Sequence, residues 1–260
     1  MLSSFVVAVS NLPDAHAAGL AVDSSGWCPQ SSPCYLTTGG ANEVIVVYAD
    51  AWDASNVTLS SIHDTAGLSF HHRASASNFT DQVYLDTEEW WAVSAGPLLN
   101  DNMTFTWSIP PTWNDQVVFG IAGANTSQPF DPSPLLPAAA DKGYAAITTE
   151  NANDMVISVA NNFNGENCPC ANATDGYTSI YDSQNISTEY QVQSSAVSSL
   201  QVTFNIMPDL VPGSIADALQ GIGPPISSTT HSTTSSSSFF TCRTWPDVSP
   251  FCHSLCLLRL

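Results

Sequence analysis

The chain has 260 residues, of which 43% are hydrophobic, so it is long enough to bury one large core or two smaller ones. It carries 4 lysines and arginines against 23 acidic residues, which gives a formal net charge of −19. Nucleic-acid binding needs clustered cations that replace phosphate counterions, and an anionic membrane surface would repel this chain, so we exclude both as partners.

Residues 1–17 have the pattern of a secretory signal peptide. Phe5–Val9 is a short apolar stretch, and Ala15–Ala17 fits a small-x-small cleavage site, which predicts a mature start near Ala18. No lysine or arginine precedes the apolar stretch, so either the true start lies upstream or this segment is the first strand. We expect a secreted or cell-surface protein.

Two cysteine pairs point to the same compartment. Cys28 and Cys34 bracket a short loop, and Cys168 and Cys170 form a Cys-Pro-Cys sequence. These four cysteines allow three pairings, of which Cys28–Cys34 closes easily and pairing between the two clusters is the rival. A metal site would need Cys-x-x-Cys spacing with histidines nearby, so we expect disulfides rather than metal.

The middle of the chain, from Val44 to Leu219, consists of short predicted strands rich in Val, Ile, Thr and aromatic residues, separated by Gly, Asn, Asp and Pro. The predicted strands are Val44–Ala49, Val57–Ile62, Leu68–His72, Val83–Leu85, Trp90–Ser94, Met103–Ile109, Val117–Ala122, Tyr144–Thr148, Met155–Ala160, Tyr177–Tyr181, Ser187–Gln193, Leu200–Ile206 and Ser214–Leu219. We therefore predict an all-β fold, a two-sheet antiparallel β-sandwich of jelly-roll or immunoglobulin-like type, over residues 18–226.

Three sequence echoes predict that this domain consists of two similar half-repeats, at about residues 20–125 and 140–222. Thr37–Ala49 is echoed by Thr148–Ala160, and Glu89–Ser94 is echoed by Glu189–Ser194. Thr104-Phe105 is echoed by Thr203-Phe204 in the same order. In this alignment Tyr190 matches Trp90, and the recurrence of Glu89 as Glu189 favours a shared strand plan over catalysis.

Asn-x-Ser/Thr sequences support export and predict a glycoprotein. The abundance of Asn, Ser and Thr produces several such sequences by chance, so the excess is mild. We expect Asn78, Asn125 and Asn172 to lie in loops. The predicted glycosylation sites are Asn56, Asn78, Asn102, Asn125, Asn172 and Asn185.

The C-terminal part has a different composition. Residues 227–238 form a Ser/Thr-rich stalk, and residues 239–260 form an atypical tail containing Cys242, Cys252 and Cys256. No apolar run in this tail approaches the roughly 18 residues that span a membrane. We interpret the tail either as a frameshifted or mis-called anchor or as a small disulfide-bearing appendage, and we expect membrane attachment only through such an anchor.

The stretch VFGIAGANTSQPFDPSPLLPA, together with GLAVDSSG, ANEVIVVYA, SIHDTAGLSF, NANDMVISVA and SIADALQ, resembles a group of archaeal secreted and cell-surface β-sandwich proteins. The resemblance covers Gly19–Gln220. It implies an extracellular sandwich with a Ser/Thr-rich stalk and usually a C-terminal anchor. It implies no activity and no site residues.

The strongest catalytic candidate is Glu88-Glu89 beside Trp90-Trp91, because glycosidases flank a sugar with two carboxylates and stack aromatic rings on it. Adjacent strand residues point to opposite faces, so a second carboxylate would have to come from elsewhere, such as Asp86. We favour a strand with outward carboxylates and inward tryptophans.

Other candidate sites are weaker. His63-Asp64 could form part of a nucleophile triad, but hairpin chemistry explains it, and His71-His72 would point to opposite strand faces. Asp50 and Asp53 could hold Ca²⁺ with loop carbonyls. We expect no catalytic residue and no cofactor, with Ca²⁺ as the one alternative.

The leading hypothesis is a non-catalytic surface glycoprotein with a structural, adhesive or self-associating role, whose partners are envelope glycans, other surface proteins or its own copies. The first alternative is a lectin-like carbohydrate-binding module that uses Trp90 and Trp91 to stack on the ligand. The competing interpretation is that these tryptophans are buried in the core and do not contact a ligand. The second alternative is a secreted hydrolase acting on polysaccharides.

Overall fold

The computed structural model describes residues 19–30, 33–80, 82–161, 176–183, 185–204 and 213–222, all within one compact unit, Met1–Pro224. These residues form fifteen strands in four antiparallel sheets, with no helix among them that could cross a membrane. The prediction of an all-β antiparallel β-sandwich is confirmed. The predicted signal peptide, stalk and tail, with Cys168, Cys170 and Asn172, lie outside the described residues.

Eight strands form the first half of the fold. Five of them make a large sheet in the order β1-β8-β3-β6-β5, and three make a small sheet in the order β2-β7-β4. Their bounds are β1 (Ala21–Pro29), β2 (Cys34–Leu36), β3 (Glu43–Asp53), β4 (Leu59–Asp64), β5 (His71–Thr80), β6 (Val83–Ser94), β7 (Asp101–Trp107) and β8 (Trp113–Ala122).

The second half has seven strands in the described residues. The large sheet has the order β12-β13-β11-β15-β9, and the small sheet pairs β10 with β14. Their bounds are β9 (Ala138–Ala140), β10 (Tyr144–Ile147), β11 (Met155–Asn161), β12 (Thr178–Asp182), β13 (Ile186–Val192), β14 (Leu200–Thr203) and β15 (Gly213–Leu219).

The two halves share one strand order. Read from its other edge, the second large sheet runs β9-β15-β11-β13-β12, which matches β1-β8-β3-β6-β5 strand for strand in chain order. The pair β10-β14 likewise matches β2-β7, and only β4 lacks a counterpart in the described part of the chain. In both halves the strands are therefore divided between a large and a small sheet in the same way.

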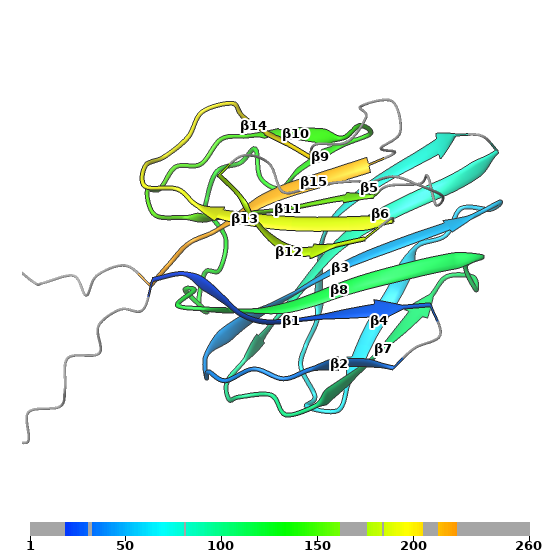
Figure 1. Ribbon diagram of the computed structural model, residues 1–260, viewed down its shortest axis with the longest axis horizontal. Helices are drawn as coiled ribbons and strands as arrows, with labels where there is room; N and C mark the ends of the chain where they lie inside the picture. Colours follow the sequence, from blue (N-terminus) through cyan, green and yellow to red (C-terminus); the bar gives the residue numbers. More distant parts are fainter. Residues whose placement is uncertain are drawn as a thin grey trace, which may run out of the picture. The chain divides into compact units, whose positions relative to one another are not determined.

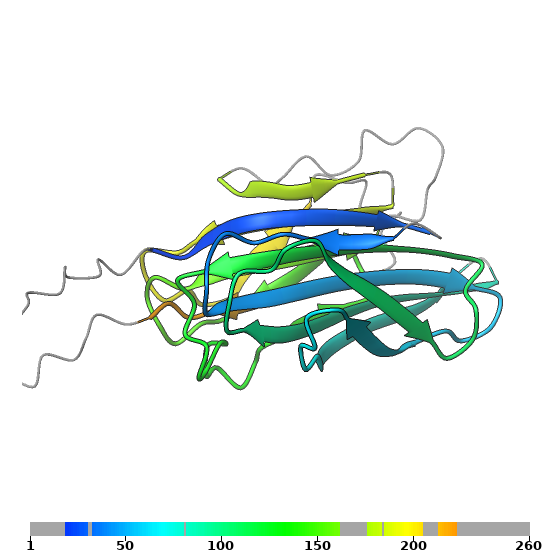
Figure 2. The ribbon, with the colours of Figure 1, turned by 90° about the horizontal axis from the view of Figure 1, so that it is seen from below.

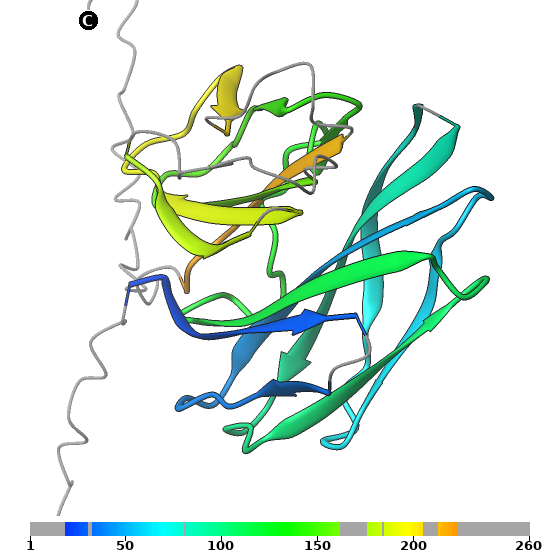
Figure 3. The same ribbon diagram turned by 45° about the vertical axis from the view of Figure 1, so that its right-hand side comes forward.

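The four sheets are stacked as layers around three cores. One core lies between the sheets of the first half, one between the sheets of the second half, and the largest lies between the two large sheets. Figure 1 shows the layers from β10–β14 at the top to β2 and β7 at the bottom, and Figure 3 shows the two halves, blue to green below and green to orange above. The structure thus has four sheets where two were predicted, because each half forms its own sandwich.

The central strands are apolar on both faces because they lie in the middle layers. In β3, Val44 and Val46 pack into the core between the halves, whereas Ile45 and Val47 pack into the core of the first sandwich. Tyr48 and Phe119 meet at the centre of the shared core, with ring centroids 5.8 Å apart. The shared core therefore fixes one half against the other by burial of apolar area.

Most predicted strands are present, with shifted ends. The predicted strands Val83–Leu85 and Trp90–Ser94 are parts of the single strand β6, and the segment expected to begin at Leu68 forms a strand only from His71. The sequence did not predict β1, β2 or β9. The signal for β1 is weak because the strand is rich in small and polar residues. The signals for β2 and β9 are weak because each strand contains only three residues.

Candidate functional site

The carboxyl groups singled out on β6 point into the molecule. Glu88 lies between the two sheets of the first half, where its Oε1 accepts a hydrogen bond from the Leu59 backbone N–H at 2.6 Å and its Oε2 accepts one from Trp90 Nε1 at 2.7 Å. Asp86, on the same face, accepts a hydrogen bond from the Ser77 hydroxyl. The expectation of outward carboxylates is wrong, because β6 belongs to a middle layer and both its faces are covered.

Asp86 and Glu88 form a buried pair of neighbouring carboxyl groups. Burial, together with the neighbouring Glu88 carboxyl group, raises the pKa of Asp86 to about 8. His72 Nε2 lies 3.7 Å from Glu88 Oε2 at the edge of this pair. Both carboxyl groups are buried, so the pair ties β4 and β5 to β6 and presents no surface to a substrate.

Glu89 faces the opposite way, into the core between the halves. There Arg73 Nε on β5 donates a hydrogen bond to Asp217 Oδ2 on β15 at 2.7 Å, and its guanidinium group lies 4.1 Å from the centre of the Phe130 ring. Glu89 and Asp217 are fully buried, and neither oxygen of Glu89 has a hydrogen-bond partner among the described residues. We call Arg73, Glu89 and Asp217 the interface cluster.

Burial dominates the electrostatics of the interface cluster. It raises the pKa of Glu89 well above its usual value, and the Asp217 carboxylate adds to this rise while Arg73 opposes it. Burial also raises the pKa of Asp217 to about 6, against the lowering effect of Arg73. Burial therefore favours the neutral form of Glu89, whereas Arg73 favours the charged form of Asp217. The interface cluster joins the two halves and has no access for a substrate.

The echo between Glu89 and Glu189 does not hold at the level of single positions. Val46 pairs with Trp91 in the first half, whereas its echo Ile157 pairs with Tyr190 in the second half. The structure therefore matches Tyr190 with Trp91 rather than with Trp90. Because of this one-residue offset, Glu189 lies opposite Ser158 and faces the core of its own sandwich, not the core between the halves.

The two predicted stacking residues have different surroundings. Trp90 is only 8% exposed and packs in the first sandwich against His72, which agrees with the core interpretation. Trp91 is half-buried and lines a cavity of about 540 Å³ between the β4–β5 and β6–β7 loops, together with His71 and Leu98. Only Trp91 could therefore contact a ligand.

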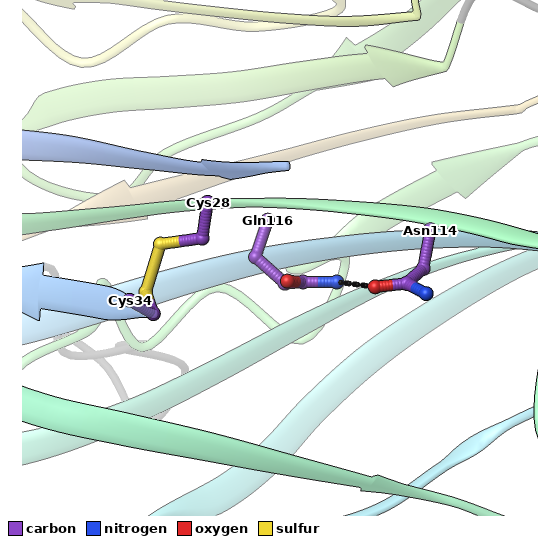
Figure 4. The surroundings of a disulfide bond; sticks show 4 residues. All are labelled: Cys28, Cys34, Asn114 and Gln116. Atoms are coloured by element: carbon purple, nitrogen blue, oxygen red, sulfur yellow. Dashed lines mark hydrogen bonds between the residues drawn. A yellow bond between two sulfur atoms is a disulfide. The ribbon is translucent and has the colours of Figure 1, made fainter. Parts of the chain in front are cut away.

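A second cavity, which the sequence did not predict, lies beside the disulfide. This disulfide groove has a volume of about 460 Å³ and is lined by Pro29, Pro33, Phe105, Trp107 and the amides of Asn114 and Gln116, among others. Gln116 Nε2 donates a hydrogen bond to Asn114 Oδ1 at 2.8 Å, and Figure 4 shows both amides beside the disulfide.

The Cys28–Cys34 disulfide forms the frame of this groove. Cys28 lies opposite Gln116 in the β1–β8 pairing, and Cys34 lies opposite Met103 in the β2–β7 pairing. Gly26 allows the close approach of the two strands, since a Cβ atom there would lie 2.7 Å from the Tyr35 carbonyl oxygen. Of the pairings that the sequence left open, the structure contains the local one, Cys28–Cys34.

Replacing both cysteines with alanine is expected to lower the free energy of unfolding by about 2 kcal/mol, because the bond closes a short loop and limits the unfolded chain. Urea unfolding of the double variant and of the wild type measures this difference. A single Cys28→Ala variant treated with a thiol-blocking reagent controls for the remaining free thiol. An unchanged unfolding midpoint in the double variant would contradict the expectation.

Asp50 and Asp53, the candidates for Ca²⁺ binding, are not brought together. Asp50 is fully buried on the face of β3 that packs between the halves, whereas Asp53 accepts hydrogen bonds from Ser55 and Thr112 at the outer end of the strand. The Thr112 hydroxyl lowers the pKa of Asp53. No group of three or more metal-binding side chains occurs within the residues that the structure describes.

The histidine candidates have structural surroundings. His71 packs against Trp91 and His72 packs against Trp90, which confirms that the two neighbours point to opposite faces. Asp64 accepts a hydrogen bond from the Leu68 backbone N–H at 2.8 Å, as a turn aspartate does. His63 lies 3.4 Å from the Ser61 hydroxyl.

A second buried carboxyl pair lies where the chain passes between the halves. Asp131 accepts hydrogen bonds from the backbone N–H groups of Ser133, Glu150 and Asn151. Burial, together with the Asp131 carboxylate, raises the pKa of Asp154 to about 8. Asp154 also lines a cavity of about 350 Å³ with Asn125 and Gln220.

The predicted glycosylation sites lie on strands as well as in loops. Asn56 is exposed in the β3–β4 loop and Asn125 lies in a turn, but Asn78 is part of β5, so the expectation of a loop there is wrong. Asn102 lies on β7 and lines the disulfide groove. The Asn185 side chain hydrogen-bonds to Asp115 on β8.

Comparison of this chain with protein-family models, with curated proteins and with solved structures finds no match. The functional inference therefore depends on the residues and their geometry alone.

Proposed function

We propose that the chain is a secreted or cell-surface glycoprotein with a structural, adhesive or self-associating role and without catalysis. The observation that carries this proposal is the use of the acidic side chains. Glu88 and Glu89, the best catalytic candidates, are both buried, and Glu88 accepts a hydrogen bond from the backbone of β4 in the facing sheet. None of the three cavities described above is lined by two carboxylates.

Turnover assays test the absence of catalysis. We expect no release of reducing sugar from a panel of neutral and acidic polysaccharides, either by the wild type or by Glu88→Gln. Release by the wild type that disappears in Glu88→Gln would contradict the proposal and favour the hydrolase. Fractionation of the producing cells would separately place the protein in the envelope or the medium.

Glycan occupancy is expected to follow side-chain access. We expect high occupancy at the exposed Asn56 and low occupancy at Asn185, because the Asn185 amide is in contact with Asp115 on β8 and a glycan there would have to fit between β8 and the second half. Glycopeptide mass spectrometry of the protein from its native host measures both sites. Full occupancy of Asn185 with unchanged thermal stability would contradict this expectation.

A second candidate function is carbohydrate binding, without catalysis. Two cavities of the first half are each lined by a half-buried tryptophan, Trp91 in one and Trp107 in the other, and neither is lined by an acidic residue. Aromatic faces beside uncharged polar groups are suited to sugars, which present both C–H faces and hydroxyl groups. Binding to an array of neutral oligosaccharides tests this candidate.

A further inference from the structure

The disulfide groove opens where a strand edge becomes uncovered. β2 pairs only with Asp101–Met103 of β7, so β2 does not cover the edge of β7 from Thr104 to Trp107. The groove lies between this edge and the beginning of β8. We propose that the disulfide groove binds a neutral sugar residue; this proposal rests on the second candidate function and assigns its site.

The side chains of the groove match both parts of a sugar. Phe105 and Trp107 are half-buried and offer apolar ring surface to a C–H face. The Gln116–Asn114 hydrogen bond uses one donor of Gln116 and the acceptor of Asn114. It leaves the Gln116 acceptor Oε1 and the donors of Asn114 Nδ2 for the ligand. An acceptor and a donor side by side suit a pair of neighbouring hydroxyl groups.

The preorganisation of the groove favours binding. Gln116 is only 3% exposed, so its amide is held by packing at the bottom of the groove. The two prolines of the rim, Pro29 and Pro33, each stand next to a half-cystine, so the disulfide fixes the wall that they form. Little conformational freedom is lost when a ligand enters such a site.

The charge of the groove specifies the class of ligand. The chain has a net charge of −19, yet none of the residues lining the groove is charged. A phosphorylated or carboxylated ligand would find no cation here and would be repelled by the rest of the surface. The absence of charge from this lining therefore favours a neutral polyhydroxy compound with a volume suited to a cavity of about 460 Å³.

A neutral sugar could reach the groove from two sources. One is a glycan of another molecule. The other is a glycan on this chain itself, because Asn102 and Thr104, the first and last residues of one predicted glycosylation sequence, both line the groove. The chemistry of recognition is the same in both cases, and the experiment separates them.

The first arm uses unglycosylated protein with its disulfide formed, made in a bacterial periplasm and labelled for an array of neutral oligosaccharides of glucose, galactose, mannose and N-acetylglucosamine. We expect Trp107→Ala and Gln116→Met each to weaken binding at least about tenfold, because each removes a contact made in a desolvated site. Phe79→Ala is the matched control and should retain binding, because Phe79 is an exposed aromatic residue that lines neither tryptophan-lined cavity. Trp91→Ala tests the other cavity separately. Near-ultraviolet circular dichroism verifies the fold of each variant.

The second arm uses protein from a glycosylating host. If the chain's own glycan fills the groove, we expect the glycan on Asn102 of the native protein to resist an endoglycosidase. In the Trp107→Ala variant the same glycan should become cleavable. The Asn102→Gln variant, which lacks this glycan, should bind array sugars in the groove. Either array binding by the first arm or this protection supports the proposal and identifies the source.

Two outcomes would overturn the assignment. Loss of array binding in Trp91→Ala but not in Trp107→Ala would leave the carbohydrate-binding function standing and place its site in the other cavity. The absence of both array binding and glycan protection would reject the groove and the second candidate function together, while the structural role proposed first would stand.

Discussion

Replacing Arg73 with methionine is expected to lower the free energy of unfolding by about 3–5 kcal/mol at neutral pH, because breaking a buried ion pair leaves an uncompensated charge. Arg73 donates to Asp217, whose side chain is fully buried between the two halves. Without Arg73, Asp217 keeps a carboxyl group beside the buried Glu89 with no cation nearby. Urea unfolding followed by circular dichroism measures the loss.

Lys142→Met is the matched control for this variant. It removes the same unit of charge from the surface, where Lys142 Nζ lies 4.2 Å from the centre of the Tyr144 ring, and should cost less than about 1 kcal/mol. The double variant Arg73→Met/Asp217→Leu should recover part of the loss, since it removes both charges. An equal loss in Lys142→Met would attribute the effect to net charge and contradict the interface explanation.

The free energy of unfolding is expected to fall as the pH rises from about 4 to about 8. Burial raises the pKa of Asp86 and of Asp154 from 3.8 to about 8, and it raises the pKa of Asp115 and of Asp217 to about 6. At a pH between the unfolded pKa of 3.8 and these native pKa values, the native state holds more protons than the unfolded state. The contribution of these groups to the free energy of unfolding is therefore complete below about pH 4. It falls as the pH rises through the native pKa values, by more than about 2 kcal/mol in total.

Urea unfolding at constant ionic strength over this pH range measures the slope. Asp154→Asn keeps a neutral side chain at that position and should make the free energy of unfolding fall less steeply above about pH 6. Asp53→Asn is the control and should leave the decline unchanged, because the pKa of Asp53 is lowered. The Arg73→Met penalty should also shrink below about pH 6, where Asp217 takes up a proton. Stability that rises with pH would contradict the neutral state of the buried carboxyl groups.

Several elements could be predicted because their signals are local. The apolar run Val44–Ala49 specified β3, and alternation in Thr104–Trp107 specified β7. The spacing of Cys28 and Cys34 was short enough for a local disulfide, which the structure contains. The continuous apolar run of β3 also carried an unused signal, since a strand without alternation is typically buried on both faces.

The candidate sites were harder to predict because they depend on which face of a strand is covered. Alternation separates Glu88 from Glu89, but it cannot show that a second sandwich covers the face of Glu89. The echo suggested that Glu89 and Glu189 were equivalent. The strand pairing shows that they are not, because Ile157 pairs with Tyr190 where its echo Val46 pairs with Trp91, so the two glutamates face different cores. The disulfide groove joins β1, β7 and β8, which are far apart in the sequence.

The sequence by itself determined the all-β class and most of the strands, and it offered the local Cys28–Cys34 disulfide as one of the open pairings, because each depends on residues close together in the chain. Only the tertiary structure decided that two sandwiches stack as four layers. The physical reason is burial: a middle sheet needs apolar or neutralised groups on both faces. The stacking therefore turned Glu89 from a candidate surface carboxylate into part of the core between the halves, where it lies with the buried Asp217.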